Sequence, residues 1–145
     1  MKILGLNLGH DGSAAVVIDR KLSSFISTER ITRNKKQRGV TDAVISYVLQ
    51  AAGTCVSDID AIVICNLYSD IFQGKPLFDF SGLFDVDIDH DTFAKNIGGA
   101  LYMAGSVTYK KMKKPLFLVN HHTAHCAYSY YSSPFKEALS VSFDV

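Results

Sequence analysis

Two short runs of apolar residues, AIVIC at 61–65 and PLFLV at 115–119, constrain the fold most strongly. Neither run alternates between apolar and polar residues, and continuous apolar strands of this kind are buried on both faces of a parallel sheet. Parallel strands in one sheet need a crossover connection, which usually contains a helix. The two runs therefore predict an α/β domain with parallel strands at its centre.

The rest of the chain supplies strands and helices around these two runs. Three β-rich segments come first, joined by connections whose lengths suit antiparallel hairpins. The first helical pattern opens at Thr41-Asp42 and stops at Gly53. The segment from Asn66 to His90 is irregular, acidic and aromatic, and we expect it to form a long insertion or flap.

The expected elements follow the order β-β-β-α-β-α-β-α-β. This is the order of one lobe of the ribonuclease-H-like fold, with a mixed sheet, that sugar kinases, actin and Hsp70-type ATPases share. Besides the two apolar runs, the expected strands are Lys2–Asn7, Ser13–Ile18, Leu22–Thr28 and Ala138–Phe143, and the expected helices are 41–53, Thr92–Lys110 and Thr123–Tyr131.

Length, charge and cysteine content narrow the class of protein. With 145 residues and a net charge of +1, the chain has the size of one domain and no global field that would attract nucleic acid or anionic lipid. No apolar stretch approaches the roughly 20 residues needed to span a bilayer. The cysteines Cys55, Cys65 and Cys126 are widely spaced, which predicts buried, reduced thiols in the cytoplasm. Because the sequence ends directly after its last expected strand, we expect residues 1–145 to be one lobe of a longer protein.

A glycine-rich turn, GLNLGHDGSA at 5–14, joins the first two expected strands. In phosphotransferases of this fold, the equivalent turn places backbone amides and small residues against the phosphates of a nucleotide. Those enzymes carry an aspartate where this sequence has an asparagine, which argues against phosphoryl transfer. The alternative is a plain hairpin turn whose His10 and Asp11 point to solvent. The candidate nucleotide-binding residues are Asn7, Gly9, Gly12 and Ser13.

A basic, polar stretch, ERITRNKKQRG, runs from Glu29 to Gly39. It is either a solvated loop or a surface on which Arg30, Arg33 and Lys35 gather around a phosphate or carbamoyl oxygen, since arginine binds such groups with two parallel hydrogen bonds. No aromatic residues are interleaved with the basic ones, which argues against nucleic acid as a partner.

The stretch HHTAH at 121–125 holds three of the chain's histidines. His121 and His125 share a helix face at a spacing that can chelate one transition metal, and His122 and His125 could do the same. Ordinary polar histidines at the start of a helix are the alternative. Asp144 ends the next expected strand and should lie beside that helix start. Two imidazoles and a carboxylate leave coordination positions open, as in sites where Fe(II) or a similar divalent metal takes part in chemistry. Cys126 and His125 are disfavoured as a nucleophile pair, because neighbours in a helix point in different directions.

The sequence resembles the O-carbamoyltransferase family, which includes nodulation-factor and antibiotic-tailoring carbamoyltransferases. The resemblance is collinear over nearly the whole chain and is weakest between Asn66 and His90. It rests on GLNLGHDGSAAVV, ERITRNK, NHHTAHCAYSYYSSPFKEAL and the FD at 143–144, in that order.

This resemblance implies a two-lobed ASKHA-type domain, related to the tRNA threonylcarbamoyl-transferase, together with a separate adenylate-forming domain. The separate domain makes carbamoyl-adenylate from carbamoyl phosphate and ATP. The ASKHA-type domain then moves the carbamoyl group onto a hydroxyl of a small-molecule acceptor. Residues 1–145 match its N-terminal lobe, so the second lobe and the adenylate-forming domain would lie outside this sequence.

The resemblance also implies roles for particular residues. The metal is expected to be iron in contact with the nucleotide phosphate, with one further aspartate ligand from the second lobe and His122 as an adjacent non-ligand. The implied ligands in this chain are His121, His125 and Asp144.

The implied catalytic residues are His10, Arg33 and Lys35. His10 matches the active-site histidine, and an imidazole is suited to take the proton of an acceptor hydroxyl. Arg33 and Lys35 match a basic segment that faces the substrate. The sequence departs from the family where EER is common, because Thr28 replaces the first glutamate, and at Lys36, where a histidine or an acid is common.

Two other functions compete with carbamoyl transfer. One is a nucleotide-binding ATPase or sugar kinase of the same fold, which would hydrolyse ATP without carbamoyl phosphate. The other is a non-catalytic isolated lobe, because half of the nucleotide cleft and one metal ligand would be missing from it. We expect neither a nucleic acid nor a membrane as a partner.

Overall fold

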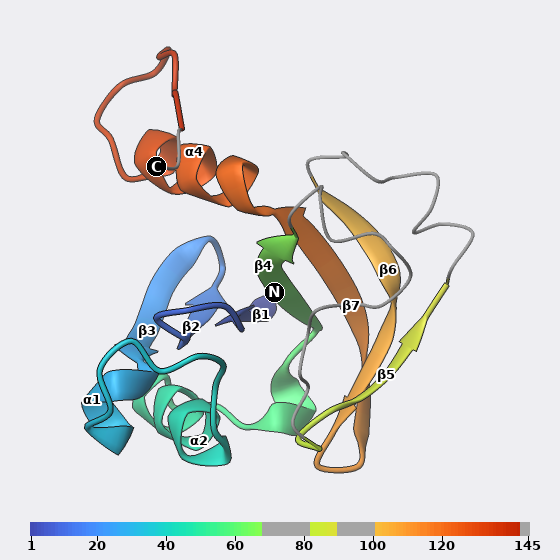
Figure 1. The fold of residues 1–145 in the computed structure, drawn as a ribbon. Coiled ribbons are helices and arrows are strands. Elements are labelled where there is room, and N and C mark those ends of the chain that lie inside the picture. Colours follow the sequence, from blue (N-terminus) through green and yellow to red (C-terminus); the bar gives the residue numbers. More distant parts are fainter. Residues whose placement is uncertain (68–81, 90–100, 143–145) are drawn as a thin grey trace.

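A computed structural model describes residues 1–67, 82–89 and 101–142 (Figure 1). Along the chain its elements are β1 (Lys2–Asn7), β2 (Ser13–Ile18), β3 (Lys21–Ser27), α1 (Thr28–Thr32), α2 (Asp42–Ala51), the 3-10 turn η1 (Val56–Asp58), β4 (Ala61–Leu67), β5 (Asp85–Ile88), β6 (Leu101–Tyr109), β7 (Met112–Asn120) and α4 (His121–Tyr131).

The strands of the described residues form one mixed sheet in the order β3-β2-β1-β4-β7-β6-β5. β1, β4 and β7 are parallel neighbours at its centre, and the remaining pairings are antiparallel. The prediction of an α/β fold with buried parallel strands from the two apolar runs is therefore confirmed. The predicted antiparallel arrangement of the first three strands is also confirmed.

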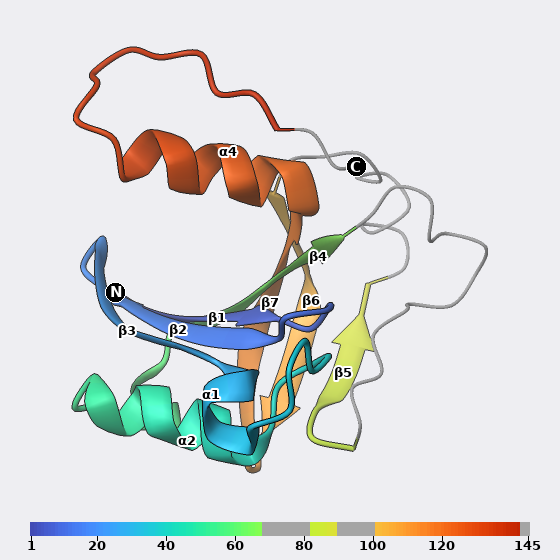
Figure 2. The ribbon, with the colours of Figure 1, turned by 60° about the vertical axis from the view of Figure 1, so that its left-hand side comes forward.

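Two rows of apolar side chains cross the parallel strands and form the middle of the core. Leu4 pairs with Ile62, which pairs with Leu116, and all three are fully buried. Two residues further along each strand, Leu6, Ile64 and Leu118 repeat this arrangement. α2 lies on one side of the sheet and α4 on the other (Figure 2), and the core cluster includes α2 through Val44, Ile45, Val48 and Leu49.

The ends of α2 agree with the signals in the sequence. The Thr41 side chain accepts a hydrogen bond from the Val44 backbone N–H and caps the helix. The chain leaves the helix through Gly53, whose φ of 62° suits glycine.

The helix predicted over Thr92–Lys110 is wrong over 101–109, where the chain forms β6; residues 92–100 lie outside the described residues. Lys110 and Lys111 both have positive φ and make the tight turn that pairs β6 with β7. A Cβ on Gly105 would lie 2.1 Å from the Asp87 carbonyl oxygen of β5. Gly105 therefore permits the close approach of β5 to β6.

The element order also differs from the prediction in other segments. Residues 138–142 form no strand, so the strand predicted over Ala138–Phe143 is wrong over these residues, and Phe143 lies outside the described part. Residues 138–142 lie near α4, where Ser142 Oγ is 3.0 Å from His122 Nδ1, and they join no edge of the sheet. β5 forms inside the expected insertion. The strand expected over Leu22–Thr28 ends at Ser27, and α1 covers Thr28 and the first residues of the basic stretch.

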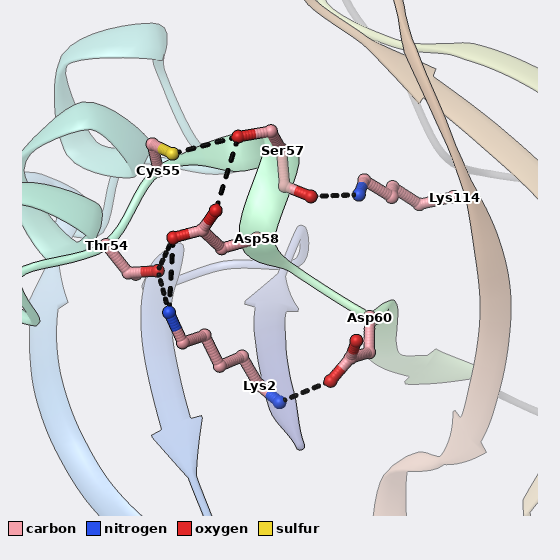
Figure 3. Close-up of polar contacts among 7 residues, drawn as sticks. All are labelled: Lys2, Thr54, Cys55, Ser57, Asp58, Asp60 and Lys114. Atoms are coloured by element: carbon pink, nitrogen blue, oxygen red, sulfur yellow. Dashed lines mark hydrogen bonds and ion pairs between the residues drawn. The ribbon is translucent and has the colours of Figure 1, made fainter.

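Polar groups tie together the amino-terminal edge of the parallel strands (Figure 3). The Lys2 ammonium lies 3.1 Å from Asp58, and the Lys2 backbone N–H donates to Asp60 at 2.7 Å. Lys114 of β7 donates to the Ser57 carbonyl oxygen at 2.8 Å. The hydrogen bond from Lys2 lowers the pKa of Asp58. These contacts hold β1 and β7 against the loop that leads into β4.

The three cysteines are free, but the prediction that all are buried is wrong for Cys55, which is exposed. Cys55 directly precedes η1, a turn with no buried residue, and its Sγ lies 3.0 Å from Ser57 Oγ (Figure 3). Cys65 is half-buried on β4, and burial raises the pKa of its thiol.

A second polar contact joins α2 to the turn between β6 and β7. Tyr109 is 1% exposed, and its hydroxyl donates to the Asp42 carboxylate at 2.5 Å. The Lys110 ammonium lies 2.9 Å from the same carboxylate. The Tyr109 hydrogen bond, helped by Lys110, lowers the pKa of Asp42, whereas burial and Asp42 raise the pKa of Tyr109.

We expect Tyr109→Phe to lower the free energy of unfolding by about 1 kcal/mol at pH 7, because it removes a partly buried hydrogen bond to a charged acceptor. The pKa of Asp42 is lowered in the folded state, so this stabilisation is fully present above its ordinary value of 3.8 and is lost as the pH falls below it. Urea denaturation at pH 7 and at successively lower pH values below 3.8 measures both effects. Tyr47→Phe is the control, because Tyr47 is 46% exposed; equal losses in the two variants would contradict the role of Asp42.

Candidate functional site

The three parallel strands end at the same edge of the sheet. β1 ends at Asn7, where the glycine-rich turn begins, and β7 ends at Asn120, where α4 begins. Ligands of open α/β sheets bind outside the carboxyl ends of parallel strands. Figure 2 shows α4 crossing above the sheet from this edge.

A cavity of about 440 Å³ lies at this edge and joins two predicted groups of site residues. Asn7 and Ser13 come from the predicted nucleotide-binding turn, and His121 and His125 come from the predicted metal site. The other lining residues are Leu22, Phe25, Cys65, Ala124 and Tyr128. The structure therefore brings segments more than one hundred residues apart in the sequence to one cavity.

A larger cavity of about 650 Å³ shares Asn7, Ser13 and Cys65 with the first one and extends between α4 and the sheet. Gly5 and Val63 line it from the face of the sheet opposite the buried leucines. Its lining is mostly apolar and aromatic: Ala15, Val17, Leu22, Phe25, Tyr128 and Tyr131 are among its residues. The combined hollow has a polar end at the histidines and an apolar body.

His121 and His125 point their Nε2 atoms at each other across one turn of α4. The two nitrogens are 3.1 Å apart, and the rings meet nearly at a right angle, 88°. Two nitrogen ligands about 2.1 Å from one ion, at an angle of about 90–110°, are about 3.0–3.4 Å apart. The pair therefore has the geometry of two ligands of one metal. A hydrogen bond from one neutral imidazole to the other accounts for the same distance.

Local sequence explains where this pair begins. The Asn120 side chain accepts a hydrogen bond from the Thr123 backbone N–H at 3.2 Å and caps α4. The helix therefore starts at His121, earlier than the predicted start at Thr123, and His121 and His125 share one face. His122 lies 3.0 Å from Ser142 Oγ instead.

The predicted third ligand, Asp144, lies outside the described residues. Within the part of the chain that the structure describes, no group of three or more histidine, cysteine, aspartate or glutamate side chains could hold a metal ion. Two imidazoles are thus the contribution that the described residues can make to a metal site.

The glycine-rich turn is folded by its own side chains. Asn7 Oδ1 accepts a hydrogen bond from the Gly9 backbone N–H at 3.0 Å, and Asn7 Nδ2 donates to the Asp11 carbonyl oxygen at 3.3 Å. Asp11 has a φ of 57°. His10 is exposed, and its Nδ1 lies 3.0 Å from Asp11 Oδ2. The Gly9 amide predicted to face a phosphate donates within the turn.

The turn is bonded directly to the basic segment. Gly12 N–H donates to the Gln37 carbonyl oxygen at 2.9 Å, and Gly39 N–H donates to the Gly9 carbonyl oxygen at 3.1 Å. A Cβ on Gly12 would lie 1.8 Å from the Gly39 carbonyl oxygen. Gly12 is therefore needed because another stretch of backbone passes against it. The sequence predicted a glycine here for a different reason, the approach of a phosphate.

The predicted catalytic residues lie on the two sides of this contact. His10 belongs to the turn, and Arg33 and Lys35 belong to the basic segment, where all three side chains are exposed. Arg33 ends α1 with a φ of 63°. None of the three lines either cavity. The predicted site residues thus fall into a cavity group and a surface group, and the glycine-rich turn connects the two.

Sequence reasoning missed residues that have no motif. Cys65 and the aromatic side chains Phe25 and Tyr128 line the cavity, and alternation along β3 and β4 was the available signal for the first two. Thr28, fully buried, was noted as a departure from a family pattern but not as a structural residue.

The fold is a mixed α/β sheet with a hollow at the carboxyl ends of its parallel strands, the place where open α/β sheets in general bind their ligands. Comparison with known protein families places the chain more specifically than the fold does. A family model described as the carbamoyltransferase N-terminus matches residues 2–145, and the chain belongs to this family.

Relatives agree with this membership. Nodulation protein U of Rhizobium tropici is 27% identical over 151 residues, which cover 99% of this chain and 25% of that protein. Nodulation protein U of Azorhizobium caulinodans is 41% identical over 66 residues, covering 44% of the chain and 12% of that protein. An uncharacterized protein of Synechocystis sp. is 28% identical over 162 residues, 98% of the chain and 25% of that protein. The chain spans about a quarter of the length of the curated relatives that it matches throughout.

Among residues 1–67, 82–89 and 101–142, no helix has the length and apolar character needed to cross a membrane.

We expect Gly12→Ala to lower the free energy of unfolding by about 3 kcal/mol, because the new methyl group overlaps the Gly39 carbonyl and forces the backbone apart. Thermal or urea denaturation measures the change. Gly5→Ala is the matched control, since its Cβ would meet the Ala15 carbonyl oxygen at an ordinary 3.9 Å, and we expect it to cost less than about 1 kcal/mol. Equal stability of the two variants would contradict the close contact.

Proposed function

We propose that the chain is the N-terminal lobe of an O-carbamoyltransferase. Its reaction moves a carbamoyl group from carbamoyl-adenylate, made from carbamoyl phosphate and ATP, to a hydroxyl of a small-molecule acceptor. Membership in the carbamoyltransferase family supports carbamoyl transfer in general. The observation that carries the proposal is the cavity in which Asn7 and Ser13 meet His121 and His125, because it joins a nucleotide-type turn to a metal-type histidine pair.

The sheet supports the ribonuclease-H-like, ASKHA-type assignment. In the order β3-β2-β1-β4-β7, only β2 runs antiparallel to the rest, as in one lobe of that fold. β6 and β5 then extend the sheet beyond β7. In this proposal residues 1–145 form one lobe, and the second lobe and the adenylate-forming domain belong to the complete protein. The free cysteines support a cytoplasmic location.

We propose His121, His125 and Asp144 as the ligands in this chain of Fe(II) or a similar divalent ion. The separation of the two Nε2 atoms fits two bonds to one ion. When bound, such an ion would supply a Lewis acid that stabilises the departing phosphate. Asn7 and Ser13 line the same cavity and have side-chain groups that can bind a nucleotide phosphate.

Transfer itself requires a base for the acceptor hydroxyl. As the acceptor oxygen forms its bond to the carbamoyl carbon, the bond from that carbon to the phosphate oxygen breaks, AMP leaves, and the hydroxyl proton goes to His10. The Asp11 carboxylate at Nδ1 favours the tautomer that leaves Nε2 free to accept this proton. Arg33 and Lys35 bind the anionic part of the donor.

A sugar kinase or ATPase of the same fold is the alternative. Asn7 stands where those enzymes need an aspartate, and here its side chain folds the turn. Hydrolysis of ATP by the complete protein in the absence of carbamoyl phosphate would favour this alternative.

We expect His10→Ala to lower kcat for carbamoyl transfer by about 100-fold or more, as loss of a general base does. The assay follows AMP release and the carbamoylated acceptor with the complete protein. Lys111→Ala, in the turn between β6 and β7, is the control and should keep full activity. Unchanged transfer by His10→Ala would sink the role of His10.

We expect the complete protein to carry tightly held iron that His125→Ala loses. Metal analysis after purification, followed by titration with Co²⁺ as a spectroscopic probe, measures this loss. His122→Ala is the matched control and should keep the metal, because His122 faces Ser142. Full metal content in His125→Ala would rule out the histidine pair as ligands.

A further inference from the structure

Thr28 is a fully buried polar residue at the first position of α1. Each of its hydrogen-bonding groups has a partner. Its backbone N–H donates to the Gly12 carbonyl oxygen at 2.7 Å, its hydroxyl donates to the Gly39 carbonyl oxygen at 2.8 Å, and its carbonyl oxygen accepts from Thr32 Oγ1 at 3.1 Å. Buried polar groups of this kind are costly to leave unpaired, so these contacts are strongly specified.

The two acceptors, Gly12 and Gly39, belong to different functional segments. Gly12 closes the turn that carries His10, and Gly39 closes the basic segment. The segments are also bonded to each other by Gly12 N–H to the Gln37 carbonyl and by Gly39 N–H to the Gly9 carbonyl. Together with the hydrogen bonds of Thr28 to Gly12 and Gly39, these contacts form a closed set, which we call the ring.

Backbone conformations that are unfavourable on their own occur in both segments. Asp11 in the turn has a φ of 57°, and in the basic segment Arg33 and Lys36 have φ of 63° and 56°. Left-handed residues other than glycine persist where surrounding contacts fix them. Thr28 is the residue whose side chain and main chain bind both segments at once.

We propose that Thr28 is a positioning residue, which sets the separation between the turn that carries His10 and the basic segment that carries Arg33 and Lys35. An anion bound by the basic segment then lies at a fixed distance from the imidazole of His10. A transfer reaction needs this fixed geometry between the bound group and the base. This inference rests on the proposed function for the identity of the reaction, and on the hydrogen bonds alone for the role of Thr28.

Thr28→Val tests the proposal, because valine keeps the shape of threonine and removes the hydroxyl. Thr28→Ser is the matched control that restores it. We expect amide hydrogen exchange at Gly12 and Gly39 to accelerate by about tenfold or more in the valine variant, and by less than about threefold in the serine variant. The Ala52 amide, which ends α2, should exchange at its wild-type rate in both variants, because it lies outside the ring.

Binding and turnover then separate positioning from simple stabilisation. We expect Thr28→Val to weaken binding of inorganic phosphate, followed by NMR at the amides of Arg33 and Lys35, by about tenfold. In the complete protein it should lower kcat and raise KM for the carbamoyl donor, with rescue by Thr28→Ser. Wild-type phosphate affinity and kcat/KM in a folded Thr28→Val protein would overturn the proposal, as would faster exchange at Ala52 to the same extent as at Gly39.

The same experiments distinguish this inference from the function on which it rests. If the wild-type complete protein transferred no carbamoyl group, the proposed function would fail. Local loosening at Gly12 and Gly39 together with weaker phosphate binding in Thr28→Val would still support the positioning role.

Discussion

Parallel pairing of β1, β4 and β7 is the constraint on which the rest of the structure depends. The rows Leu4–Ile62–Leu116 and Leu6–Ile64–Leu118 fix the register of the three strands, since a shift by one residue would turn these side chains away from the core. Because the strands are parallel and in register, their carboxyl ends reach the same edge together. The glycine-rich turn and the helix that carries the histidines both start from that edge. The packing of the core therefore places these two segments, remote in the sequence, at one cavity.

Sequence reasoning succeeded where a local pattern determined the outcome. The three N-terminal strands, α2 between Thr41 and Gly53, and the strands of the two apolar runs each had a complete local signal. It failed at β6, because the pairing of this segment with β5 and β7 makes it a strand, and its own residues do not specify those partners. The contact of Gly12 with Gly39 was out of reach for the same reason, since it depends on how a loop folds back in space.

In the candidate site, too, local sequence signals were sufficient for some residues and not for others. Helix spacing predicted that His125 shares a face with His121 and with His122, and it did not choose between them. The structure places His121 Nε2 3.1 Å from His125 Nε2, and His122 Nδ1 3.0 Å from Ser142 Oγ. Asp144 lies outside the described residues and stays a prediction. The basic residues Arg33 and Lys35 were identified by their charge and by the family resemblance. The hydrogen bonds that join their segment to the turn of His10 are between backbone atoms, so the side-chain sequence could not predict them.

α4 has no buried residue, although it carries the histidine pair. It is anchored at its first turn, where it continues directly from β7 and is capped by Asn120, and its 11 residues extend about 16 Å from that anchor. The helix is therefore attached to the sheet at the end that carries the two histidines. The two ring nitrogens, 3.1 Å apart, lie at this attached end, whereas Tyr128 and Tyr131, which line the larger cavity, lie toward the other end of the helix.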